Sequence, residues 1–90
     1  MAEYRLLIKP SAAKEIDALG QKKDRQRIVN RIAALASEPG PTQSEKLAGI
    51  EGRYRIRQGE FRIVYSINDA TRTVEIVKVG HRRDVYHGAT

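Results

Sequence analysis

The fold of this chain is decided by residues 54–65, which read YRIRQGEFRIVY. Apolar and basic residues alternate on both sides of Gly59-Glu60, and a period of two is typical of strands that bury one face. Glycine at the first central position of a two-residue turn suits a type II′ turn. The stretch therefore predicts a β-hairpin.

A two-residue turn also predicts the register of this hairpin. Counting outward from the turn, Arg57 lies opposite Arg62, and apolar or aromatic residues pair with one another on the other face. We expect the apolar face to bury Tyr54, Ile56, Ile63 and Tyr65 against helices. We expect the opposite face to project four arginines together, Arg53, Arg55, Arg57 and Arg62.

The sequence before the hairpin begins with a predicted strand and a predicted helix. Residues 4–8 are mostly aromatic and aliphatic and stop before Pro10, as a short strand does. Ser11 is a candidate cap for a helix over residues 12–19, and Gly20 is a candidate for its left-handed end.

A second helix is predicted over residues 22–37. Its apolar residues Ile28, Ile32 and Leu35 recur at helical spacing, and arginines take its other faces. The Pro-Gly-Pro sequence that follows cannot continue a helix, so residues 39–52 are expected to form a connecting loop.

After the hairpin, the β-branched residues 73–79 predict a last strand that ends at Gly80. The predicted order is βααβββ in a single domain over residues 1–90, because a chain of this length buries only one core. This order favours an α+β fold, with both helices on one face of a small, largely antiparallel twisted sheet.

The net charge of +6 favours nucleic acid, an anionic membrane or an acidic protein as partners. The chain has no cysteine and two histidines, so we expect neither disulfides nor a metal site. It has no apolar segment long enough for a signal peptide or a membrane span, so we expect a cytoplasmic protein without a membrane partner.

The opposed arginines of the hairpin carry the first chemical prediction. Like charges directly opposite each other on paired strands destabilise a sheet by about 0.2–1 kcal/mol per pair. An anion between Arg57 and Arg62 would remove this penalty, and guanidinium groups match phosphate oxygens, which favours a phosphate site. The alternative is a solvated face whose arginines keep the sheet soluble, with Glu60 and Glu75 as partners.

Residues 80–86, GHRRDVY, follow the last predicted strand and add further candidates. His81 can transfer protons near neutral pH. Tyr86 can stack on an unpaired base, and Arg82 and Arg83 add positive charge. Each residue alone is more often structural, and their proximity to the arginine face is what favours a function.

Taken together, these residues resemble the RelE branch of the RelE/ParE superfamily, the toxins of bacterial and archaeal toxin-antitoxin modules. The resemblance covers nearly the whole chain and is carried by residues 46–49, 54–57, 61–65 and 79–86. It implies an endoribonuclease that inhibits translation by cleaving messenger RNA in the ribosomal A site. The 2′-hydroxyl attacks its own phosphodiester, without metal or cofactor.

The resemblance also implies roles for single residues. Arg57 lines the scissile phosphate, and as an arginine it is a poor base and acts electrostatically. Arg62 stabilises charge, Arg82 aids the leaving group and Tyr86 orients the base, with His81 as a proton donor or acceptor. The general base stays open between Glu45, Glu51, His81 and none. Further RNA contacts are expected from Arg53, Arg55 and Arg83.

The family implies one partner and leaves two other functions open. The partner is a cognate antitoxin with an acidic segment that wraps the toxin, as a heterodimer or a heterotetramer. The first alternative function is a ParE-like inhibitor of DNA gyrase without nuclease activity. The second is an inactive RNA-binding member. The residues that the nuclease branch requires, Arg62, Arg82 and Tyr86, are all present.

Overall fold

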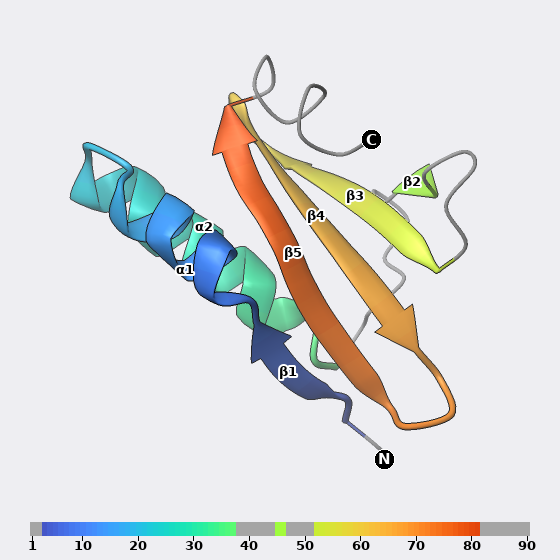
Figure 1. The fold of residues 1–90 in the computed structure, drawn as a ribbon. Coiled ribbons are helices and arrows are strands. Elements are labelled where there is room, and N and C mark those ends of the chain that lie inside the picture. The colour runs from blue at the N-terminus through green and yellow to red at the C-terminus, as the bar shows by residue number, and fades with distance from the viewer. Residues whose placement is uncertain (1–2, 38–44, 47–51, 82–90) are drawn as a thin grey trace.

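One mixed sheet organises the molecule. The computed structural model describes residues 3–37, 45–46 and 52–81, and within them five strands are ordered β1-β5-β4-β3-β2 (Figure 1). β1 runs parallel to β5, and all other neighbouring strands are antiparallel. The elements are β1 Arg5–Ile8, α1 Pro10–Asp17, α2 Lys22–Ala34, β2 Glu45–Lys46, β3 Arg53–Gln58, β4 Phe61–Asn68 and β5 Thr73–His81.

The predicted hairpin is present with its predicted register. β3 and β4 pair Gln58 with Phe61 across the turn, and Arg57 with Arg62 next to it. Gly59 has a φ of 60°, which a side chain at this position would strain, and Glu60 does not share this left-handed conformation. The turn chemistry therefore sets which residues face each other, as the sequence predicts.

Helix α1 begins earlier than predicted. Pro10 is its first residue and Lys9 its N-cap, without a hydrogen bond from a capping side chain. Proline has a fixed φ that suits the first helical position, so it displaces Ser11 from the expected cap.

The end of α1 also differs from the prediction. The helix closes at Ala18 in right-handed geometry, and Gly20 is not among the left-handed glycines of the described residues. The Arg25 guanidinium instead donates from Nη1 to the carbonyl oxygen of Leu19 at 2.6 Å. A cation from α2 thus satisfies the carbonyl that follows the helix.

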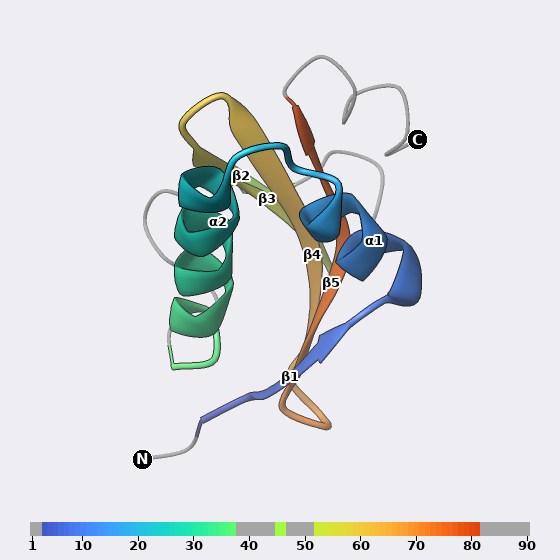
Figure 2. The ribbon, with the colours of Figure 1, turned by 90° about the vertical axis from the view of Figure 1, so that its left-hand side faces the viewer.

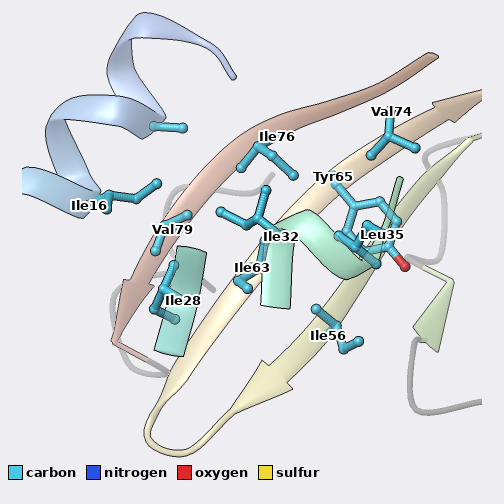
Figure 3. Packing of buried hydrophobic residues seen from close by; sticks show 11 residues of the cluster. Ile16, Ile28, Ile32, Leu35, Ile56, Ile63, Tyr65, Val74, Ile76 and Val79 are labelled. Carbon is cyan, nitrogen blue, oxygen red and sulfur yellow. The ribbon is translucent and has the colours of Figure 1, made fainter. Parts of the chain in front are cut away.

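The core lies between the helices and one face of the sheet. Ile28, Ile32 and Leu35 are buried as predicted, against Ile63 and Tyr65 of β4 and their neighbours (Figure 3). Helix α1 packs on β5, and α2 lies towards the β3 side of the sheet (Figure 2). The α+β class and the one-sided packing are therefore confirmed.

Two details of the sheet depart from the prediction. The stretch expected to be a loop contains the two-residue strand β2, which pairs with β3. β5 continues past Gly80 to His81, and an irregularity between Val64 and Tyr65 shifts its register against β4. Such an irregularity inserts a residue and reverses the alternation of faces, which a periodic pattern does not reveal.

The edge of β5 beyond β1 is covered by a carboxylate. Glu15 of α1 accepts a hydrogen bond from the backbone N–H of Val79 at 2.9 Å, and its other oxygen lies 2.7 Å from Lys78 Nζ. Because β1 ends at Ile8, this side chain satisfies a backbone donor that has no strand partner there. Helix α1 is therefore fixed to the sheet by polar contacts as well as apolar ones.

Candidate functional site

The sheet face opposite the helices carries the candidate site. We call it the arginine face and define it by Arg55 and Arg57 of β3 and Arg62 of β4. The register pairs Arg57 with Arg62, so the two guanidinium groups leave the sheet from directly opposed positions. Arg57 is exposed and Arg55 is half-buried.

Arg62 is buried, with only 7% of its surface exposed, whereas the sequence led us to expect it to project from the surface. Its Nη1 donates to the carbonyl oxygen of Phe61 at 3.2 Å. Among the described residues, no carboxylate pairs with it. Val64, on the same face, is also buried without belonging to the helix-side core. The arginine face is thus partly covered, and its central cation is largely withdrawn from water.

A buried cation that no carboxylate of the described residues pairs with is unfavourable for folding alone. Removing a charge from water costs free energy unless an opposite charge or hydrogen bonds compensate. The positions of Arg57 and Arg62 therefore suit an anion that is bound during function. This is the physical property that a phosphate site requires.

The other described basic candidate and one candidate base lie near this face. Arg53 is half-buried at the start of β3. The register of the short strand β2 pairs Glu45 with Arg55. The backbone position of Glu45 is therefore next to the arginine face.

The structure separates His81 from the arginines. β5 includes His81 and pairs it with Phe61, whose side chain alternates with that of Arg62. The imidazole ring meets the Phe61 ring edge-on, with centroids 6.1 Å apart, and its Nε2 lies 3.7 Å from Glu60 Oε2. The expectation that His81 converges with the arginine face is wrong, because the strand continues and alternation places it on the helix side.

Several candidates lie outside the described residues: Glu51, Arg82, Arg83 and Tyr86. Within the described residues, no group of three or more histidine or acidic side chains could hold a metal ion. None of the helices in this part of the chain has the length and apolar character needed to cross a membrane.

Comparison with known proteins decides the family. A model of the ParE toxin of type II toxin-antitoxin systems matches residues 6–86. The chain belongs to the RelE/ParE superfamily. It is accordingly a toxin of a type II toxin-antitoxin system.

Individual relatives agree with this family assignment. Toxin RelE of Mycobacterium tuberculosis is 26% identical over 83 residues, which cover 92% of this chain and 86% of the relative. RelE in the archaeal RelE-RelB complex from Pyrococcus horikoshii is 29% identical with a TM-score of 0.78, over 89% of this chain and 96% of that one. The isolated RelE toxin of E. coli is 28% identical with a TM-score of 0.76, over 96% of this chain and 94% of that one.

Proposed function

We propose that this RelE/ParE toxin is an endoribonuclease that cleaves messenger RNA on the ribosome by attack of a 2′-hydroxyl on the adjacent phosphodiester. The observation that carries the proposal is the opposed pair Arg57–Arg62, whose second member is buried without a carboxylate among the described residues. The similarity to several proteins named RelE supports the same reaction.

The two arginines suit the charge that develops during this reaction. Attack of the 2′-oxygen places additional negative charge on the oxygens of a pentacoordinate phosphorus. A fixed cation in a water-poor site stabilises such charge more strongly than a solvated one does. Arg62 supplies the fixed cation, and the exposed Arg57 binds the phosphate from the facing strand. Neither can act as a base, because arginine stays protonated.

We propose Glu45 as the general base that takes the proton of the 2′-hydroxyl. Its strand position is paired with that of Arg55, whereas His81 lies on the other side of the sheet. A carboxylate within hydrogen-bond reach of a hydroxyl can act as a general base. In the proposed site, Arg82 stabilises the negative charge on the leaving 5′-oxygen, which takes its proton from water, and Tyr86 stacks on the neighbouring base.

The proposed partner is an acidic antitoxin. Solved relatives include RelE-RelB complexes from Pyrococcus horikoshii and E. coli. The net charge of +6 on this chain suits an acidic segment that covers the arginine face and blocks RNA.

The test is a translating ribosome mixture programmed with a defined message, in which new 5′ ends are mapped by primer extension. We expect cleavage of ribosome-bound message by the wild-type protein and by Arg5→Ala, which removes an exposed arginine two strands away from β4. We expect no cleavage with Arg62→Ala or Glu45→Gln. Intact message with the wild-type protein, or full cleavage with Arg62→Ala, contradicts the proposal.

Inhibition of DNA gyrase is the second candidate, because the matching family model describes ParE toxins. A gyrase supercoiling assay separates the two. Inhibition of supercoiling together with intact message in the translation mixture supports the ParE-like function.

A further inference from the structure

A second concave site lies on the helix side of the sheet, at the turn of the β3–β4 hairpin. It has a volume of about 380 Å³, and we call it the hairpin-end pocket. Figure 2 shows this turn next to the first turn of α2, which forms the other wall. The pocket is lined by Asp24, Arg27, Gln58, Gly59, Glu60, Phe61 and His81.

The lining combines groups that recognise a nucleotide. Phe61 and His81 present two rings at an interplanar angle of 81°, so a base that stacks on one meets the edge of the other. Arg27 is an exposed cation at the pocket wall, and the Gln58 amide can both donate and accept hydrogen bonds. Two carboxylates, Asp24 and Glu60, complete the set.

The carboxylates favour one base. A carboxylate only accepts hydrogen bonds, and guanine offers two neighbouring N–H donors on its Watson–Crick edge. Adenine and cytosine place an acceptor nitrogen beside a single amino group, and the acceptor would be repelled. Uracil offers a single donor.

We propose that the hairpin-end pocket binds a guanine nucleotide of the RNA strand that the arginine face cleaves, and so contributes to sequence preference. The proposal rests on the proposed nuclease function for the identity of the strand. Guanine stacks on Phe61 and donates to Asp24 or Glu60, while Arg27 binds its phosphate.

The hairpin turn connects the two sites. Arg57 and Gln58 are consecutive in β3, so alternation places one on the arginine face and the other in the pocket. A methyl group built on Gly59 would meet nothing within 4 Å. Gly59 therefore places no side chain in the way of an RNA strand that passes over the turn from the arginine face into the pocket.

The test measures binding of 5′-GMP, 5′-AMP, 5′-CMP and inorganic phosphate to the full-length chain by NMR titration. The arginine face also attracts phosphate, so the position of binding is read from the resonances of Phe61 and His81. We expect GMP to shift these resonances at lower concentration than the other probes. We expect Arg27→Gln to weaken GMP binding by about tenfold, as loss of a hydrogen bond to a charged group does, and Gln58→Ala to weaken it by about fivefold, because its amide is neutral.

Lys23→Gln is the matched control, because it removes an exposed cation from the same helix without lining the pocket. It should change GMP affinity less than twofold, or about 0.4 kcal/mol. Equal affinity for all probes, absence of shifts at Phe61 and His81, or wild-type affinity in Arg27→Gln overturns the proposal. Arg62→Ala should lose cleavage and keep these shifts, so failure of the pocket and failure of the nuclease are distinguishable.

Discussion

Arg62 is a buried positive charge, which is unfavourable for folding and favourable for binding an anion. Its guanidinium is withdrawn from water beside Arg57, and within residues 3–37, 45–46 and 52–81 it donates a hydrogen bond to a backbone carbonyl oxygen. For folding, an apolar side chain of similar length would serve better, because it needs no compensation for lost hydration. For phosphate binding, a positive charge fixed in a sheet is an advantage.

This contrast predicts opposite effects of one substitution. Arg62→Met should abolish cleavage and raise the free energy of unfolding by about 1 kcal/mol, because it replaces a buried charge by an apolar chain. Urea denaturation and the primer-extension assay measure the two effects on the same preparation. A clear loss of stability would mean that Arg62 has a structural partner.

A second residue-scale prediction concerns pH. The Tyr4 hydroxyl donates to Asp69 Oδ1 at 2.5 Å, and this hydrogen bond, with the carboxylate charge, raises the pKa of Tyr4 above its ordinary value of 10.0. The contribution to stability is therefore present below pH 10 and lost as the pH rises through the raised pKa. Asp69→Asn should lower the pKa of Tyr4 toward its ordinary value, which a tyrosinate absorbance titration detects. An unchanged titration in this variant contradicts the assignment.

For single residues, the sequence predicts which residues pair across neighbouring strands better than it predicts which side chains are buried. The turn at Gly59 sets the pairing of Arg57 with Arg62, so local chemistry is sufficient. The burial of Arg62 depends on what covers the sheet face opposite the helices. The alternation of apolar and basic residues along the strands does not show whether that face is covered. The position of His81 depends on where β5 ends, and the strand continues one residue past the expected end at Gly80.

At the scale of elements, the hairpin turn is the most sensitive point. Gly59 has a φ of 60° and open space around it, so Gly59→Ala introduces backbone strain without a clash. We expect a loss of about 1–2 kcal/mol in the free energy of unfolding, the cost of left-handed geometry for a residue with a side chain.

Gly20→Ala is the matched control for this prediction. Gly20 also has open space around it, but it does not have a positive φ. The substitution should be neutral or stabilise the protein by about 0.4–1 kcal/mol, because alanine restricts the unfolded chain. Equal losses in the two variants, measured by urea denaturation, would show that backbone conformation is not the cause.

The elements themselves were predictable where periodicity is strong. The buried stripe of α2 and the alternation in β3 and β4 identify both structures. The boundaries of α1 were not predictable from periodicity. Pro10 begins the helix in place of a cap at Ser11, and Arg25 binds the carbonyl oxygen of Leu19 where a left-handed Gly20 was expected. The two-residue strand β2 is too short to give any periodic signal.

At the scale of the whole molecule, a single core carries the stability. Ile32 is 2% exposed between α2 and the sheet, and Ile32→Ala should lower the free energy of unfolding by about 2–5 kcal/mol. A domain of this size has a small free energy of unfolding, so a large part of the population would unfold. Thermal denaturation by circular dichroism measures the change.

Val29→Ala provides the control for this substitution. Val29 is on the same helix but 47% exposed, so its truncation should change the free energy of unfolding by less than about 0.5 kcal/mol. Similar losses in the two variants would contradict the position of the core.

The parallel pairing of β1 with β5 joins Arg5 to Thr73, the first strand of the chain to the last. During synthesis, β1 therefore has no partner in the sheet until β5 has left the ribosome. Pairings between residues so distant in sequence close a large loop and slow folding. A newly made toxin therefore completes its sheet only when β5 is available, so the synthesis of the C-terminal part of the chain sets the earliest time at which the folded domain exists.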